Sequence, residues 1–323
     1  MEKILKNRPM TISTDQRKKG SFLNSKKFKN NVVFWSFLLP VLFSFTMVII
    51  VPFIMGIYYS FTDWDGIKLG SFVGLENYAK IFSSDPRFLH AIVITVIYTL
   101  LNIIVVNIVS FVLALLVTQE TRGKNLYRVG FFIPNLIGGL ILGYIWQFIY
   151  KSILPEFGLL FGFDYLANNI LLGSRETAIL ALVITGTWQY AGYIMMIYVT
   201  ALQNVPKDLI EAAAIDGANA WQRLKNIVLP MVAQAFTITL FLTLVNSFKQ
   251  FDVNVSLTAG GPSTLFMSKA INGTELLALN IYNEAFVNNN MALGQAKAVI
   301  FFIALLAVSL VQVYVNKKKE VEL

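Results

Sequence analysis

Long apolar runs separated by short polar stretches dominate this sequence. Six runs carry few charges and are long enough to cross a bilayer, whose hydrocarbon core of about 30 Å needs about 20 helical residues. They cover residues 33–61, 89–118, 128–150, 177–202, 229–257 and 292–315. The pattern therefore predicts an all-α polytopic membrane protein with six transmembrane helices, kinked at Pro40, Pro52 and Pro134.

One polar connection is longer than a simple loop requires. Residues 203–228, here called the polar island, contain EAAAIDGANAWQRLKNIV from Glu211 onward. Good helix formers, with alanines at 212–214, precede Gly217, and glycine can adopt the left-handed conformation that ends a helix. A second helix is expected from about Asn219, so we predict a helix–turn–helix in water. The pattern alone is equally compatible with an amphipathic helix that lies on the membrane surface.

Basic residues indicate which side of the membrane the polar island occupies. Cytoplasmic connections carry an excess of Lys and Arg. Most of the 26 basic residues lie in Lys3 to Lys29, Arg122 to Arg128, Lys207 to Lys225 and Lys317 to Lys319. We therefore predict that both termini and the polar island are cytoplasmic. The predicted organisation is a basic tail at 1–31, a transmembrane domain at 32–316 and a short tail at 317–323.

Composition excludes several classes of protein. The chain is 56% hydrophobic and only 14% charged, which is far more apolar than a soluble domain needs. Its net charge of +8 follows from the topology, so nucleic-acid binding is not expected. It has no Cys, no Gly-x-x-x-x-Gly-Lys-Ser/Thr phosphate loop and a single His, His90. We therefore expect no catalytic residue, metal site or bound cofactor, and predict a multi-pass protein of the cell membrane that is not an enzyme.

Several stretches resemble one transporter family. Glu211-Ala-Ala, Gly217 and the Ile-x-Leu-Pro that begins at Ile227 together resemble the docking loop of the membrane-spanning subunits of binding-protein-dependent ABC importers. FFIPNLIGGLILGYIWQFIY (131–150) is similar to the third span of the same family, and three stretches are similar to its carbohydrate-type members: FVGLENYAKIF (72–82), FDVNVSLTAGGPSTLF (251–266) and IYNEAFVNNNMALGQAKAVIFF (281–302). Lys297 departs from the small or hydroxyl residue that is common there, which leaves its role in packing or substrate contact open.

The resemblance implies partners and coupling residues for this chain. The coupling residues would be Glu211, Ala212, Ala213, Asp216 and Gly217. They would contact a cytoplasmic ATPase dimer, which uses ATP and Mg while this chain binds no cofactor. The other implied partners are a second permease subunit, expected to form a heterodimer, and an extracellular or periplasmic solute-binding protein.

Polar side chains within the spans are candidates for a translocation pathway, because a polar group in a membrane costs free energy unless it is satisfied or lines a cavity. The candidates are Asn246, Lys249, Gln250, Asp252 and Asn254 in the fifth run and Trp188, Gln189 and Tyr193 in the fourth. Helical spacing predicts Asn246, Lys249 and Gln250 on one side, with Asn254 one turn further along. Lys249 and Asp252 could form an ion pair. The alternative is that some of the amides only join helices, and for Asn102 and Asn107 the two interpretations are equally supported.

Amides and aromatic rings suit a neutral sugar, whereas a phosphate would favour clustered Arg, which the spans lack. We therefore predict the transmembrane subunit of an ATP-driven ABC importer that carries a sugar, and the resemblance favours an oligosaccharide. One alternative is an ABC permease for a polyol or glycerol phosphate. Two others come from different classes: an ion-coupled secondary transporter, which would work alone, and a structural membrane scaffold.

Overall fold

The computed structural model describes residues 26–68, 70–119 and 122–317 of the chain, so most of the two predicted tails lies outside the described residues. The chain divides into two compact units, Met1–Met55 and Gly56–Leu323. The first unit contains α1 (Lys26–Phe45) and the π-helix η2 (Thr46–Ile50), and the boundary falls within α2 (Val51–Tyr59). The helix α1 begins at Lys26, so it includes the last residues of the predicted basic tail.

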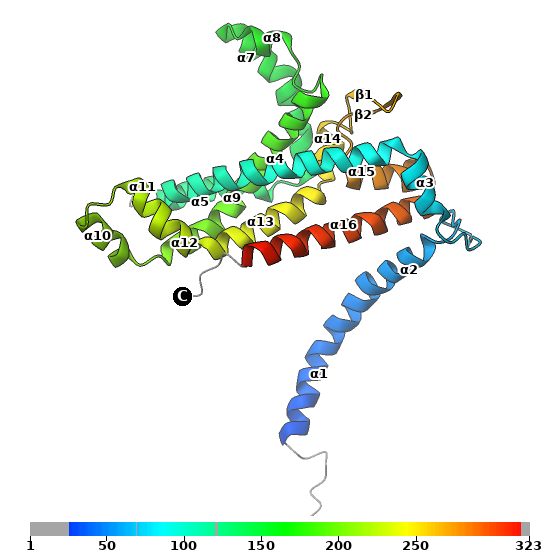
Figure 1. Ribbon diagram of the computed structural model, residues 1–323, viewed down its shortest axis with the longest axis horizontal. Helices are drawn as coiled ribbons and strands as arrows, with labels where there is room; N and C mark the ends of the chain where they lie inside the picture. The colour runs from blue at the N-terminus through cyan, green and yellow to red at the C-terminus, as the bar shows by residue number, and fades with distance from the viewer. Residues whose placement is uncertain (1–25, 69, 120–121, 318–323) are drawn as a thin grey trace, which may run out of the picture. The chain divides into compact units, whose positions relative to one another are not determined.

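The second unit is almost entirely helical (Figure 1). Its elements after α2 are α3 (Glu76–Ser84), α4 (Pro86–Val117), α5 (Lys124–Phe132), η3 (Ile133–Leu136), α6 (Gly139–Phe148), η4 (Ile149–Ile153), α7 (Leu154–Phe161), α8 (Asp164–Asn168), α9 (Arg175–Gln203), α10 (Lys207–Ile215), α11 (Ala220–Arg223), η5 (Leu224–Val228), α12 (Leu229–Met231), α13 (Ala233–Phe248), α14 (Asp252–Leu257), β1 (Ser263–Phe266), β2 (Lys269–Asn272), α15 (Leu277–Tyr282), η6 (Asn283–Val287) and α16 (Met291–Lys317). The strands β1 and β2 form an antiparallel hairpin that sequence reasoning missed.

The core of this unit forms where α4 packs against α9 and α13. Val106 from α4 and Ile194 and Tyr198 from α9 are fully buried there. A second buried cluster includes Leu142 of α6, Leu182 of α9 and Leu257 of α14. The apolar faces that the sequence places on these helices are thus satisfied by one another.

The described residues contain four helices long and apolar enough to cross a membrane, or up to six if each of two bent pairs counts as one span. The four are Lys29–Tyr59, Pro86–Val117, Arg175–Gln203 and Met291–Asn316. The predicted third span is a pair bent by 99°, and the helices that lead into the predicted fifth span are bent by 70°. The all-α membrane architecture is confirmed, and the count of six holds only when the bent pairs are treated as single spans.

The bend in the third span follows from its glycines and proline. Pro134 lies in the 3₁₀ turn η3, and Gly138 is extended at φ −60° and ψ 137° before α6 begins. One turn later, a Cβ atom on Gly143 would lie 2.9 Å from the Cβ of Ser256 and 3.1 Å from the backbone nitrogen of Leu257. Glycine is therefore required for α6 to lie directly against α14.

The fifth span differs from the prediction of one continuous helix. The helix α13 ends at Phe248, the backbone at Phe251 is non-helical at φ −126° and ψ −59°, and α14 starts at Asp252. The helical row predicted from Asn246 to Asn254 is therefore wrong, because the chain turns between the two residues to pack α14 on α6.

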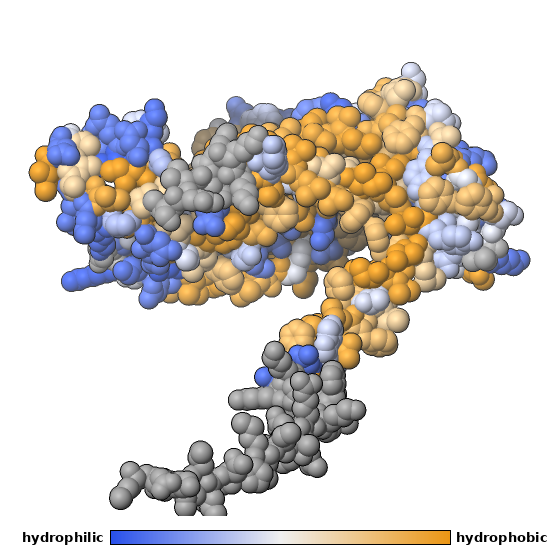
Figure 2. Space-filling model, turned by 60° about the horizontal axis from the view of Figure 1, so that its bottom comes forward, coloured by the Kyte–Doolittle hydropathy of each residue, from blue (hydrophilic) through white to orange (hydrophobic). Residues whose placement is uncertain are grey.

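Hydropathy is segregated along the second unit. Figure 2 shows hydrophobic side chains over the middle of the face in view and hydrophilic side chains gathered at its ends, including the end where Figure 1 places α10. Many large apolar side chains on α4 and α16, such as Leu100 and Val311, are exposed. An apolar belt between two polar ends is what a bilayer requires of a protein surface.

Candidate functional site

The polar island forms a compact helical projection that begins with α10. Ile210 packs inward against a buried cluster of Val205, Val228 and Val232. The outward side carries large apolar groups, with Ile215 87% and Trp221 66% exposed.

The turn after α10 is fixed by backbone hydrogen bonds. Gly217 has φ +82°, its N–H donates to the Ala214 carbonyl at 3.2 Å, and the Ala218 N–H donates to the Ala213 carbonyl at 2.9 Å. These are the two bonds of a Schellman motif, which needs a left-handed residue at the position of Gly217. No heavy atom lies within 4 Å of where a Cβ of Gly217 would be, so only the backbone conformation demands glycine here.

The helix α11 is capped by its own side chains. The Asn219 side chain accepts from the Gln222 N–H at 2.9 Å, and the Gln222 side chain accepts from the Asn219 N–H at 2.8 Å. This reciprocal capping box satisfies two backbone donors that would otherwise lack partners. The two helices of the polar island therefore hold their shape by local bonds.

The structure places the predicted coupling residues on this projection. Glu211, Ala212, Asp216 and Gly217 are exposed, and Ala213 is half-buried. Four of the five thus face outward on one short helix and its turn, with small side chains beside two acidic ones. Their contact with an ATPase remains a prediction.

Seven of the eight predicted pathway residues are at least partly accessible. Asn246, Lys249, Asp252 and Trp188 are exposed, and Gln250, Gln189 and Tyr193 are half-buried. Gln189 donates from Nε2 to the Ile137 carbonyl at 3.0 Å, which ties α9 to the bend in the third span. Among the described residues no ion pair joins Lys249 to Asp252, so the pairing considered from sequence is not formed.

Asn254 is fully buried rather than lining an open path. Its Nδ2 donates to the Thr274 carbonyl at 2.8 Å, and its Oδ1 accepts from the Leu276 N–H at 3.1 Å. Both bonds join α14 to the chain that follows the β hairpin. The Asn254 side chain therefore holds the backbone at Thr274 and Leu276 against α14. Its position in the sequence did not indicate this structural role.

A layer of buried hydrogen bonds joins α4, α9 and α13. Asn102 Nδ2 donates to Ser247 Oγ at 2.8 Å, and Asn107 Oδ1 accepts from the Tyr198 hydroxyl at 2.8 Å. The Tyr198 hydroxyl in turn accepts from Thr239 Oγ1 at 2.7 Å. For Asn102 and Asn107 the structure favours the second of the two interpretations, in which these amides join helices.

Trp188 lines an apolar pocket between α4, α5 and α9 with a volume of about 800 Å³. The Thr187 hydroxyl is buried in the pocket wall and has no hydrogen-bond partner among the described residues. The other walls include Val105, Pro134 and Ile184. Because its lining is almost entirely apolar, this pocket does not suit a sugar. Trp188 is therefore a weaker pathway candidate than the exposed polar groups of the fifth span.

A polar pocket of about 360 Å³ lies near the start of α16, between the connection that follows α2 and helix α3. It is lined by Asp63, Trp64, Asp65, Asn77 and Asn290 among others, and the Trp64 ring stacks on Tyr59 with centroids 4.3 Å apart. The backbone N–H groups of Ile67 and Lys68 donate to Asp65 Oδ1 at 2.9 and 2.8 Å and hold the pKa of that carboxyl below its usual value.

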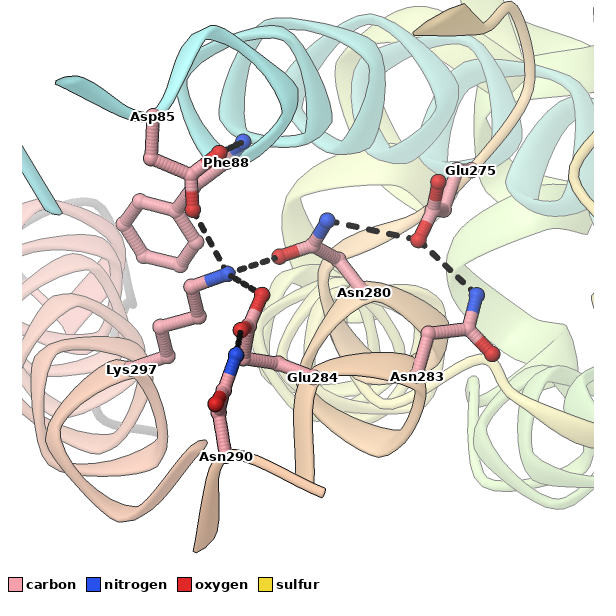
Figure 3. Close-up of polar contacts among 8 residues, drawn as sticks. All are labelled: Asp85, Phe88, Glu275, Asn280, Asn283, Glu284, Asn290 and Lys297. Atoms are coloured by element: carbon pink, nitrogen blue, oxygen red, sulfur yellow. Dashed lines mark hydrogen bonds and ion pairs between the residues drawn. The ribbon is translucent and has the colours of Figure 1, made fainter. Parts of the chain in front are cut away.

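Near the same pocket, buried charges meet around Lys297. Figure 3 shows Asp85, Asn280 and Glu284 converging on its ammonium group. We call these residues, together with Phe88, Glu275, Asn283 and Asn290, the Lys297 cluster. Sequence reasoning noticed only that Lys297 was unusual, because its partners are distant in the chain. Among the described residues no group of three or more His, Asp or Glu side chains is placed to hold a metal ion.

A family model and curated proteins similar to this chain both describe components of transport systems. Residues 110–321 match the model of a family described as "Binding-protein-dependent transport system inner membrane component". The chain is 44% identical over 299 residues to the "Probable starch degradation products transport system permease protein AmyD" of Thermoanaerobacterium thermosulfurigenes, covering 93% of this chain and 99% of that protein. It is 31% identical over 297 residues to the "Multiple sugar-binding transport system permease protein MsmF" of Streptococcus mutans, covering 92% and 99%.

A solved structure has the same fold. One chain of a bacterial alginate ABC transporter, crystallised in complex with an alginate pentasaccharide-bound periplasmic protein, superposes with a TM-score of 0.74. The match covers 92% of this chain and 98% of that one at 18% sequence identity. At this identity the similarity establishes the arrangement of helices.

Proposed function

Because this chain belongs to the family of binding-protein-dependent transport system inner membrane components, the permease subunits of ABC importers, we propose that it forms half of a pathway through which an oligosaccharide enters the cell. Family membership makes it a transport component and not an enzyme. The proposal that the substrate is an oligosaccharide rests on one observation. The chain is 44% identical, over nearly the whole length of both chains, to a permease named for starch degradation products.

Coupling to ATP is assigned to the polar island. Its α10 presents Glu211 and Ala212 to solvent, the turn after α10 presents Asp216, and the small alanine allows another backbone to approach closely. The Schellman turn at Gly217 and the capping box of α11 keep the projection rigid. A rigid projection can transmit the closure of a cytoplasmic ATPase dimer, which binds ATP and Mg, into movement of the spans.

The basic residues on the polar island and in the tails support an orientation in which both lie on the cytoplasmic side. The end that carries α3, the β hairpin and α15 then faces outward. A solute-binding protein delivers the sugar at that end, as the alginate transporter's complex with a periplasmic protein suggests. A second permease subunit completes the pathway as a heterodimer.

The sugar is handled by exposed polar groups of the fifth span and by the half-buried Tyr193 of the fourth. Asn246, Lys249 and Asp252 are accessible at the end of α13 and the start of α14, and Gln250 lies between them. Amide and carboxylate groups recognise sugar hydroxyls, and Tyr193 offers an aromatic face for the apolar side of a pyranose ring. Asn254 is left out of this set, because its side chain is buried and bonded to the backbone.

Uptake by cells that lack the chain tests the proposal. Cells that express it with its partner subunits should accumulate a labelled starch fragment, and cells without it should not. An excess of unlabelled oligosaccharide should compete, whereas a polyol or glycerol phosphate should not. If glycerol phosphate competes and the oligosaccharide does not, the assignment of an oligosaccharide as the substrate is wrong. Counterflow by the purified chain without an ATPase would overturn the mechanism in favour of a secondary transporter.

A further inference from the structure

The side chain of Lys297 is completely buried, and all three N–H donors of its ammonium group have acceptors. It projects from α16, and its Nζ lies 2.6 Å from Asp85 Oδ2, 2.7 Å from Glu284 Oε2 and 3.3 Å from Asn280 Oδ1. An ammonium group has three N–H donors, and each has an acceptor here. The ring of Phe88, 5.6 Å from Nζ, adds a cation–π contact.

These partners come from three different parts of the fold. Asp85 caps the start of α4, where its Oδ1 accepts from the Phe88 N–H at 3.0 Å. Glu284 lies in η6, and its second oxygen accepts from the Asn290 side chain at 2.7 Å. Asn280 lies in α15. One ammonium group therefore joins α16 to the start of α4 and to the segment Leu277–Val287.

The same network continues toward the β hairpin. Glu275 accepts from Asn280 at 3.3 Å and from Asn283 at 2.9 Å through Oε1, and from Asn272 of β2 at 3.1 Å through Oε2. The hairpin tip is exposed, with Leu265 76% and Met267 66% accessible. The exposed surface of the β hairpin is thus connected to Lys297 through the hydrogen bonds of Asn280, Glu275 and Asn272.

The charges of the Lys297 cluster depend on one another. The ammonium group is the only positive charge drawn in Figure 3, and it faces the carboxylates of Asp85 and Glu284, with that of Glu275 behind Asn280. Removing the lysine leaves two carboxylates side by side and poorly solvated, which is strongly unfavourable. Removing all three charges together avoids this cost, because neutral polar or apolar groups tolerate burial far better.

Resting on the function proposed above, we propose that Lys297 is a positioning residue: it holds the segment Leu277–Val287, and through Glu275 the β hairpin, in one fixed arrangement against α4 and α16. The outer surface that meets the solute-binding protein is then already formed before binding. The cost of desolvating a buried ion pair offsets much of its attraction, so on this proposal the role of Lys297 is to select one geometry rather than to add stability. The affinity for a rigid surface is greater, because less conformational freedom is lost on binding.

The first experiment separates charge balance from position. Lys297→Met should lower the melting temperature of the purified chain by roughly 5–10 °C. The triple variant Lys297→Met/Asp85→Asn/Glu284→Gln should recover most of this loss. Asparagine remains a good N-cap for α4, and glutamine can still accept from Asn290. The matched control is Lys80→Met, which removes an exposed ion pair with Glu76 and should shift the midpoint by less than about 2 °C.

The second experiment measures position directly. The chain has no cysteine, so spin labels can be placed on cysteines introduced at Ser83 of α3 and Lys269 of β2, both exposed, without background labelling. The otherwise unchanged chain should give one narrow distance distribution, and the triple variant one several times broader. Equal distributions in a stable triple variant would show that Lys297 only supports the fold and would overturn the proposal.

The third experiment connects position to transport. In the assembled complex the triple variant should need about tenfold more solute-binding protein for half-maximal uptake, with the maximal rate nearly unchanged. An unchanged half-maximal concentration would also overturn the proposal. If the complex with unchanged Lys297 takes up no sugar from any receptor, the proposed function fails, and the spin-label distances still decide the role of Lys297.

Discussion

The polar island and the Lys297 cluster are both polar interruptions of an apolar chain, and they are built in opposite ways. In the polar island every charged side chain except the half-buried Arg223 is exposed, and the shape comes from backbone bonds between neighbours, such as Ala218 to Ala213. In the Lys297 cluster Lys297, Glu275 and Glu284 are buried and Asp85 is half-buried, and the three carboxylates reach Lys297 or its neighbours from separate elements. The first site follows local rules, whereas the second exists only because the fold brings distant residues together.

This difference determines what a mutation can do in each region. A charge on the polar island can be changed at little cost in stability, because water solvates it in either state. A charge in the Lys297 cluster cannot, because its partner is then left buried and unpaired. Variants of the polar island should therefore affect coupling, and single variants of the Lys297 cluster should affect stability.

The largest expected effect is that of Gly217→Pro. Proline cannot adopt φ +82°, and it removes the N–H that donates to Ala214. Uptake of labelled sugar should fall about 100-fold, a loss of coupling near 2.7 kcal/mol, while the chain still inserts into the membrane. The matched control is Gly162→Pro, at another exposed left-handed helix end with φ +73°. Normal uptake by the Gly217 variant would remove the polar island from the mechanism.

Tyr198→Phe tests whether buried hydrogen bonds elsewhere behave like those of the Lys297 cluster. The hydroxyl bridges Asn107 and Thr239, and its loss leaves the buried Asn107 Oδ1 without its donor, whereas the Thr239 hydroxyl keeps the Phe236 carbonyl as a partner. The free energy of unfolding should fall by about 1–3 kcal/mol, which lowers the melting temperature by several degrees. Tyr144→Phe, at a side chain 61% exposed, is the control and should change little. Equal midpoints for the two variants would mean that this layer does not stabilise the fold.

Glu211→Ala should separate coupling from stability most cleanly. The side chain is exposed on α10, so the free energy of unfolding should change by less than about 0.5 kcal/mol. The amount of sugar transported per ATP hydrolysed should fall about tenfold, or about 1.4 kcal/mol. Asp208→Ala, exposed on the same helix, serves as the control. A normal transport ratio combined with a large loss of stability would reverse the contrast between the two regions.

The smallest effect is expected for Lys80→Met. Lys80 and Glu76 form an i,i+4 pair at 2.7 Å on α3, with both side chains more than half exposed. Such a pair contributes less than about 1 kcal/mol, and raising the salt concentration should reduce even that. The melting temperature measured at low and high salt checks this. A loss as large as that of Lys297→Met would mean that burial is not what separates the two lysines.

Sequence reasoning succeeded where one local property decides the outcome. Length and hydropathy alone located the helices that became α4, α9 and α16, because an uninterrupted apolar run in a membrane has almost no alternative to a helix. The glycine in the polar island was also identified, because a left-handed helix end favours that residue wherever it occurs. The residues that resemble the docking loop indicated the family, which the comparisons confirm.

Sequence reasoning failed where packing decides. The kink of the third span at Pro134 was predicted, but the turn between α13 and α14 was not, because α14 packs on α6 at Gly143, which lies far away in the chain. Asn254 looked like a member of the polar row of the fifth span, yet the turn after Phe248 directs it to the backbone near Thr274. A polar residue in an apolar run has the same local appearance whether it lines a path or joins two elements.

The sequence by itself thus determined the membrane class, the positions of the long helices, the family and the surface of the polar island, since each depends on neighbours in the chain. Only the tertiary structure decided how sharply the third span bends, where the fifth span is interrupted and which polar groups are buried. It alone placed Asp85, Glu284 and Lys297 within one hydrogen-bonded cluster. The physical reason is that hydropathy and backbone conformation are local quantities, whereas the free energy of a buried charge is set by whatever the fold places beside it.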